Sequence, residues 1–275
     1  DEAMWKGVVA QLPTYLDSDG LAKYFPPRAG EAARGSDTLT AYLLAVSHEA
    51  AALDPRFALP EAQRRQMEDG LLAFVEGRLQ RSFWSPRADL DVRKLAALEA
   101  LSRTGRAQGR MLSSLTLAPE QWPTHALLDW VQILQRVQDV PQRAQRLEQA
   151  QQLLRTRLAF SGTRVGFSTE QGDAWWWLMA NTDANAARLL LVAQNEAGWQ
   201  ADMGRLASGL IARQQRGAWQ ATTANLWGSL ALRRFSAKYE ADPVSGSTRA
   251  QLGSESGRAD CPAKGAPPAQ FLPWL

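Results

Sequence analysis

The stretch that decides the fold is residues 34–53, RGSDTLTAYLLAVSHEAAAL, in which a polar turn leads into a run rich in Leu and Ala. Ser36 or Asp37 can cap a helix beginning at Thr38, because a Ser or Asp side chain accepts a hydrogen bond from a backbone N–H of the first turn. Apolar residues surround most of this helix, so it is expected to be buried on several sides. The stretch therefore predicts an inner helix over 38–53.

The same pattern, a turn rich in Gly, Ser, Pro or Asp followed by a Leu/Ala-rich helix, recurs along the chain. Further copies predict helices at 91–102, 124–138, 175–179 with 181–194, and 222–238. Pro123 directly ahead of one such helix agrees with this assignment, since the first turn of a helix does not need the N–H that proline lacks.

More polar helices are expected between these copies, at 60–80, 141–158 and 203–215, each with a single apolar stripe. The alternation of apolar and amphipathic helices predicts two concentric layers. The spacing is too irregular for a tetratricopeptide or ankyrin array. Turns that combine glycine with an aromatic residue favour a closed ring, because glycine permits close backbone approach near the axis. The predicted fold class is all-α: an α/α toroid of helical hairpins, followed by a short β segment.

Composition excludes several classes of protein. Alanine and leucine far outnumber valine and isoleucine, as in helical proteins. One cysteine and two histidines argue against a disulfide framework and a Cys/His zinc site. The net charge is +3 and the pI about 9.2, but the cations are dispersed, so nucleic acid is not an expected partner. We find no membrane-spanning stretch and no signal peptide.

The character of the sequence changes after Tyr239. Residues 241–246 are a cluster of helix breakers, 247–252 look like a strand, and 253–269 are rich in Gly, Ser and Pro. We therefore predict a helical domain over 1–239 and, over 240–275, a linker with the start of a β module.

Residues suited to nucleophilic catalysis are scarce. A serine or cysteine nucleophile needs a positioned base, and His48 and His125 fall in or at the start of predicted helices without a G-x-S-x-G motif. Packed or surface roles are favoured for both histidines. Cys261 has no neighbouring base and is interpreted as incidental.

Two carboxylate pairs could serve glycan chemistry, which uses one acid and one base or nucleophile. Asp17 and Asp19 lie in a turn, and Glu170 and Asp173 lie beside the tryptophans of 175–177. Structural roles are favoured, because Asp19 can shape a turn with its glycine neighbour and Asp173 can cap a helix.

Several separated blocks resemble bacterial alpha-2-macroglobulin-like proteins. These blocks are GSDTLTAY (35–42), RKLAALEALSR (93–103), GFSTE (166–170), WWWLM (175–179) and TTANLWGSLAL (222–232). The resemblance covers nearly the whole chain. It implies the thioester domain of that family, or its thioester-less counterpart: an α/α toroid inserted into a β-sandwich module of a very large protein. It also implies that the N-terminal part of this toroid lies outside the chain.

The function implied by the resemblance is broad-spectrum protease inhibition in host defence: a protease cuts a bait segment and is trapped when the protein rearranges. Members with a thioester carry Cys-x-Glu-Gln, which is absent here, since Cys261 is followed by Pro-Ala-Lys. Either the motif lies upstream, or the protein belongs to the subgroup that lacks it; the second explanation is favoured. The domain is then not an enzyme and uses no cofactor or metal.

The family also implies a periplasmic location, with anchoring to the inner membrane left open. Its partners would be proteases, neighbouring macroglobulin-type β domains and other envelope proteins. Candidate contact residues on aromatic turns are Tyr24, Phe25, Trp84 and Trp219, unless these side chains only pack the ring. Two alternatives remain: a toroid enzyme acting on glycans, and a binding module for another envelope protein.

Overall fold

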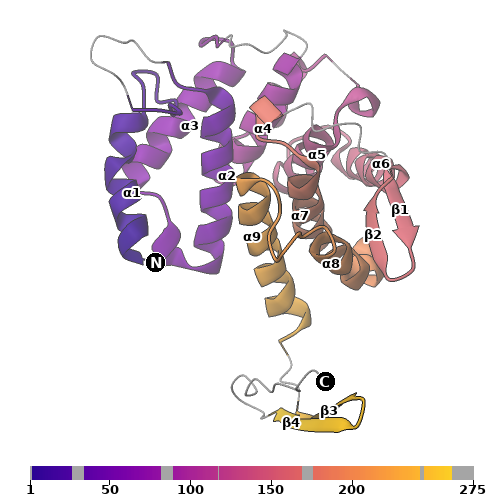
Figure 1. The fold of residues 1–275 in the computed structure, drawn as a ribbon. Coiled ribbons are helices and arrows are strands. Elements are labelled where there is room, and N and C mark those ends of the chain that lie inside the picture. Colours follow the sequence, from indigo (N-terminus) through magenta and orange to yellow (C-terminus); the bar gives the residue numbers. More distant parts are fainter. Residues whose placement is uncertain are drawn as a thin grey trace. The chain divides into compact units, whose positions relative to one another are not determined.

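A computed structural model describes residues 2–26, 34–81, 89–116, 118–168, 176–241 and 245–261. The described chain is mostly helical, with two short hairpins, so the predicted all-α class is confirmed (Figure 1). It divides into two compact units, residues 1–232 and 233–275.

Apart from α1, for which no helix was predicted, the described α-helices begin and end within a few residues of the predicted bounds, except where the outer helices were predicted too long. They are α1 (Glu2–Tyr15), α2 (Asp37–Leu53), α3 (Glu61–Val75), α4 (Leu90–Ser102), α5 (Thr124–Arg136), α6 (Arg143–Thr156), α7 (Thr182–Ala193), α8 (Met203–Ile211) and α9 (Thr222–Tyr239). Short 3-10 helices join them: η1 (Pro55–Phe57), η3 (Gly109–Ser114), η4 (Pro119–Gln121), η5 (Trp176–Leu178) and η6 (Ala197–Asp202).

The helices of the first unit form two layers. Helix α2 packs on α4, α4 on α5, and α5 on α7, whereas α3, α6 and α8 pack against the outside of this series (Figure 1). The inner helix α5 buries almost every residue, but α6 buries only Ala150 and Leu154. Trp227 of α9 contacts the two ends of the series, with its ring 6.4 Å from that of Tyr42 on α2 and 5.6 Å from the Arg188 guanidinium on α7.

Local sequence explains where the inner helices begin. Ser36 is the N-cap of α2, and its Oγ accepts a hydrogen bond from the Leu39 N–H at 3.2 Å. The Asn181 side chain caps α7 in the same way, through the Ala184 N–H at 2.9 Å. Such caps satisfy N–H groups that the helix itself leaves unpaired.

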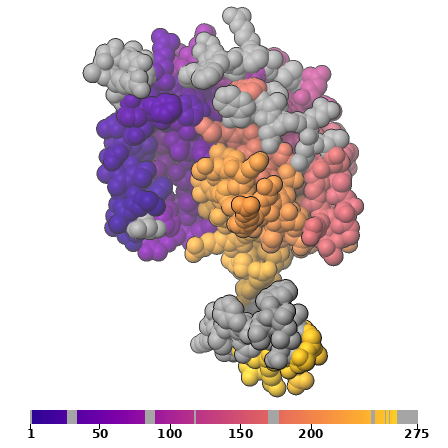
Figure 2. Space-filling model, in the orientation of Figure 1, coloured from indigo at the N-terminus to yellow at the C-terminus, as the bar shows by residue number. Residues whose placement is uncertain are grey.

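Besides most of the 3-10 helices, one α-helix and one hairpin of the first unit were not predicted. Helix α1 buries no residue, and Figure 2 shows this indigo segment along the outer edge of the helical unit. The antiparallel hairpin of β1 (Leu158–Ser161) and β2 (Arg164–Phe167) takes up the end of the predicted helix 141–158. It packs on α8 so closely that a Cβ at Gly209 would lie 2.0 Å from the Val165 carbonyl oxygen.

The described residues of the second unit include the antiparallel hairpin of β3 (Gly246–Leu252) and β4 (Glu255–Cys261), paired from Gly246–Cys261 to Leu252–Glu255. The first strand agrees with the strand expected at 247–252. Among the described residues, none of the helices has the length and apolarity that crossing a bilayer requires.

Candidate functional site

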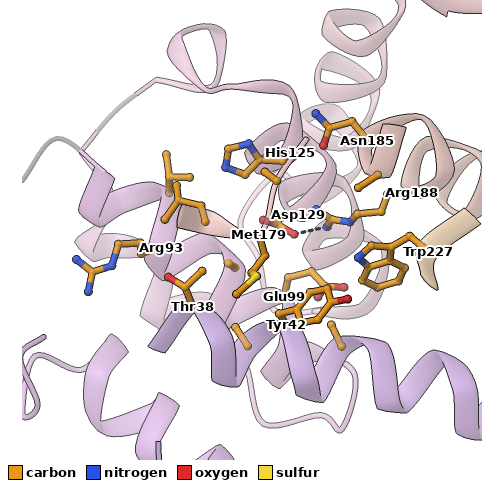
Figure 3. A pocket seen from close by; sticks show the side chains of 17 residues that line it. Thr38, Tyr42, Arg93, Glu99, His125, Asp129, Met179, Asn185, Arg188 and Trp227 are labelled. Atoms are coloured by element: carbon orange, nitrogen blue, oxygen red, sulfur yellow. Dashed lines mark hydrogen bonds and ion pairs between the residues drawn. The ribbon is translucent and has the colours of Figure 1, made fainter. Parts of the chain in front are cut away.

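The inner helices of the first unit surround one small pocket, which is the natural place to look for a site (Figure 3). Each inner helix contributes side chains: Tyr42 from α2, Glu99 from α4, Asp129 from α5, Arg188 from α7 and Trp227 from α9. We call it the axial pocket. Its free volume is about 50 Å³, room for a few water molecules and far less than a sugar ring would need.

Beside the axial pocket, charged side chains of α2, α4 and α5 and of the residue after α4 pair with one another. The Arg103 guanidinium binds Glu49 and, at 2.7 Å, Glu99. Arg136 binds the same Glu99 oxygen at 2.9 Å, and Gln132 accepts from both arginines at 3.0 and 3.1 Å. Charges so far from water require such pairing, because desolvating an unpaired ion costs several kcal/mol.

The pKa values follow from this arrangement. Burial alone would raise the pKa of Glu99, but Arg103, Arg136 and Arg188 lower it to about 2. Burial likewise opposes the charge of Arg103, yet Glu99 and Glu49 raise its pKa. Glu99 is therefore a permanent anion at neutral pH, which suits a structural ion pair and not a general acid.

A second ion pair joins α5 to α7 at the wall of the axial pocket. Arg188 donates to Asp129, as the dashed line in Figure 3 marks, and its guanidinium also lies over the Trp227 ring. Burial raises the pKa of Asp129 to about 6 in spite of Arg188, and burial with help from Arg188 lowers that of His125 to about 3. His125 is therefore neutral at pH 7.

A further ion pair and the segment before α7 lie near the N-terminal ends of α2 and α4. Arg93 binds Asp37 through two hydrogen bonds of 2.9 and 2.7 Å, with its guanidinium turned away from the pocket in Figure 3. The Trp177 indole donates to Asp89 at 3.2 Å. Met179, in the left-handed conformation at φ 58°, lies among the pocket side chains.

The predicted carboxylate pair Asp17 and Asp19 organises a loop. Both bind one nitrogen of Arg81, at 2.8 and 2.7 Å. Asp17 also accepts hydrogen bonds from three backbone N–H groups, those of Asp19, Leu21 and Gly35. Burial would raise the pKa of Asp17, but the hydrogen bonds and Arg81 lower it. Glu170 and Asp173 lie outside the described residues.

The candidate contact residues differ in exposure. Phe25 and Tyr24 are exposed, at 78% and 47%. Trp219 is buried at 6% exposure, and its indole donates to the Leu210 carbonyl at 3.0 Å, so its described contacts are internal. Trp84 lies outside the described residues. His48 is exposed on α2, and His125 is buried.

Sequence reasoning missed the charged residues of the axis. Arg93 and Asp129 lie on helices that were correctly expected to be buried, and Arg103 directly follows one of them. A charge at such a position signals a buried partner. Within the described residues, no three His, Cys, Asp or Glu side chains gather as a metal ion would require.

Fold and axis together define a class: a domain of helical pairs in two layers, whose centre is filled by packed side chains and paired charges. No family model and no curated protein matches the sequence.

Solved structures with this fold include bacterial alpha-2-macroglobulins. The Escherichia coli protein from domain MG7 to its C-terminus matches 94% of this chain with a TM-score of 0.64 and 14% identity, over 37% of its own length. Native E. coli alpha-2-macroglobulin matches 91% with a TM-score of 0.62 and 15% identity, over 14% of its length. Salmonella alpha-2-macroglobulin reacted with methylamine matches 92% with a TM-score of 0.61 and 19% identity, over 15% of its length. The predicted resemblance is confirmed for the fold, and the chain spans a minor part of each of these proteins.

Proposed function

We propose that this chain is the thioester-like helical domain of a bacterial alpha-2-macroglobulin-like protease inhibitor, which traps proteases after bait cleavage. The observation that carries the proposal is the shared fold over more than nine-tenths of the chain. Structures of E. coli alpha-2-macroglobulin include forms activated by trypsin and by porcine elastase. Proteases are accordingly the partners we propose, engaged by the full-length protein.

The proposed trap makes no covalent bond through this chain. A thioester of this family needs Cys-x-Glu-Gln, and the printed sequence contains only Cys261, followed by Pro262. This domain would contribute to capture through rearrangement alone.

The proposed role of the domain is mechanical and not enzymatic. Ion pairs that involve Arg93, Arg103 and Arg188 tie the inner helices to one another, and the axial pocket of about 50 Å³ leaves no room for a macromolecular substrate. Such a body can move as a unit against its neighbours. Those neighbours would be macroglobulin-type β domains in the periplasm, with anchoring to the inner membrane through another part of the protein. Other envelope proteins are further proposed partners.

The proposal is tested with the full-length protein that contains this chain. Small-angle scattering before and after limited cleavage by trypsin should show a change of shape that coincides with a single cut. Trypsin with its active-site serine blocked is the control and should leave the shape unchanged. A clean cut without any change of shape would contradict the proposal.

The exposed aromatic turn provides a second test of domain contact. Phe25→Ser in the full-length protein should slow or abolish the change of shape, if this turn contacts a neighbouring domain. Phe160→Ser, at a residue 52% exposed on β1, is the matched control and should behave as wild type. Equal behaviour of both variants and the wild type would remove Phe25 from the interface.

A further inference from the structure

A groove on the outside of α5 differs from the axial pocket in size and in chemistry. It lies between α6 and the segment from η3 to Trp122, with Trp130 of α5 in its lining, and its free volume is about 790 Å³. That volume is in the range of roughly 300–1,000 Å³ that is typical of ligand sites. We call it the α6 groove.

One end of the α6 groove is aromatic and apolar. Trp122 and Trp130 pack edge to face, with ring centroids 5.6 Å apart at an interplanar angle of 75°. Leu153 of α6 lines the same groove. The Trp122 carbonyl accepts a hydrogen bond at 2.8 Å from Arg157, the residue that ends α6, so Trp122 lies toward the C-terminal end of this helix.

The opposite end is cationic. Arg146 lies in the first turns of α6, about 10 Å along the helix from Leu153 at the usual rise per residue. Across the groove, Gly109 donates its N–H to Asp139, at 2.9 and 3.0 Å from the two carboxylate oxygens, and so fixes the neighbouring Arg110 near the start of α6. The N-terminal end of the α6 dipole adds positive potential there.

Arg146 is an exception among the arginines of α6. Arg155 binds Asp202 at 3.1 Å, and Arg143 donates to the Leu134 carbonyl at 2.9 Å. The Arg146 guanidinium has neither an ion pair nor a hydrogen bond to any residue in the described ranges, although it is half-buried in the wall of the groove. Within the described residues, the Arg110 guanidinium binds the Gln108 side chain, at 2.7 Å, and no carboxylate.

The anionic groups of the groove do not neutralise this end. Asp139 directs both oxygens at Gly109, and Glu120 belongs to η4, next to Trp122 and hence toward the other end. Two guanidinium groups and one committed carboxylate leave a net positive charge at the end near Arg146. Apolar surface at the far end comes mainly from the half-buried Leu153, because Trp122 and Trp130 are only 4% and 5% exposed.

We propose that the α6 groove is a binding site for an amphipathic carboxylic acid, with the carboxylate at Arg146 and the apolar body extending along α6 to Leu153 and Trp122. A guanidinium suits this role because it offers two parallel N–H donors to a carboxylate. The burial of the apolar body supplies the rest of the affinity. The proposal does not depend on protease trapping.

Isothermal titration calorimetry of the chain with dodecanoate tests the site. Saturable 1:1 binding is expected. Dodecyltrimethylammonium, which has the same tail and the opposite charge, should bind at least tenfold more weakly. Arg146→Gln should weaken dodecanoate binding by about tenfold or more, as expected for the loss of a hydrogen bond between charged groups. Leu153→Ser should weaken the binding of both dodecanoate and dodecyltrimethylammonium.

Arg164→Gln is the matched control, because Arg164 is an exposed arginine on β2 that does not line the groove. It should bind dodecanoate as the wild type does, and circular dichroism should show the same helix content for every variant. Three results would overturn the proposal: no saturable binding, equal affinity for the two tails, or no change in Arg146→Gln. Binding of an acidic, apolar peptide without binding of dodecanoate would also overturn it, and would make the groove a polypeptide docking site.

Discussion

The axial pocket and the α6 groove are both lined by α5, but they differ in how their arginines are paired. Asp129 and Trp130 are neighbours in α5; Asp129 lines the axial pocket and Trp130 lines the groove. Around the axis the buried arginines meet carboxylates, and about 50 Å³ stays free. In the groove, Arg146 meets no carboxylate among the described residues, and about 790 Å³ is open. The paired charges at the axis stabilise the fold, whereas the arginine of the groove is available to a ligand.

The largest expected effect is at the axis. Arg103→Met leaves Glu49 and Glu99 buried without their shared partner, and such a loss costs about 3–5 kcal/mol of unfolding free energy. Urea unfolding followed by circular dichroism measures it. Arg65→Met, which breaks an exposed pair with Glu61, should cost no more than about 1 kcal/mol. Similar costs for the two variants would show that the axial network is not cohesive.

Burial of neutral His125 should make the free energy of unfolding depend on pH. Its pKa is about 3 in the folded protein and 6.5 ordinarily, so between these values the unfolded chain binds the extra proton. Because of His125, the unfolding free energy of the wild type falls by about 1.4 kcal/mol per pH unit as the pH drops below 6.5. His125→Asn removes this loss, so its stability relative to wild type should rise by roughly 3 kcal/mol between pH 6.5 and 4.

Asp129 should change the free energy of unfolding in the opposite direction as the pH falls. Its folded pKa of about 6 lies above the ordinary 3.8, so its contribution improves as pH falls from 6 to 4. Asp129→Asn should therefore lose stability relative to wild type over that interval. If the difference for either variant is independent of pH, the corresponding group does not titrate as stated.

A smaller effect is expected at the cationic end of the groove. Gly109→Ala would place a Cβ 2.5 Å from the Asp139 carbonyl oxygen, which is fixed backbone, and overpacking of this kind costs about 1–3 kcal/mol. Gly204→Ala is the control, because a Cβ added at this position of α8 would have no neighbouring atom within 4 Å. This variant should be neutral or stabilising. Thermal unfolding of both variants is sufficient. A stable Gly109→Ala would show that the η3 wall adjusts easily.

The smallest effect separates the two regions most clearly. Arg146→Met should change the free energy of unfolding by less than about 0.5 kcal/mol, because no described partner loses an interaction. A loss comparable to that of Arg103→Met would mean that Arg146 is structural, and would remove the contrast between axis and groove.

Much of the fold was predictable from local sequence, because caps and apolar periodicity are local signals. Ser36 ahead of a Leu/Ala run defined α2 correctly. The hairpin of β1 and β2 was missed because its strands are only four residues long, and its first residue, Leu158, continues the stripe of the outer helix. Helix α1 was missed although Trp5, Val9 and Leu12 share one half-buried face. Its sequence also holds Gly7 and Pro13, which disfavour a helix interior.

The site was less predictable, since its contacts join distant positions. Arg103 meets Glu49 from 54 positions away, and Arg188 meets Asp129 from 59 positions away. Periodicity predicts that these helices are buried but does not identify which charges pair. Asp17 and Asp19, predicted as a turn or a glycan site, proved to share Arg81, 64 and 62 positions along the chain.

Protease trapping is tested most directly by a substrate-size assay on the full-length protein. Trypsin is incubated with it, and residual activity is measured on a small chromogenic peptide and on a large protein substrate. The proposed trap predicts that activity on the peptide persists while activity on the protein substrate is largely lost. Equal activity on both substrates, with the bait demonstrably cut, would contradict it.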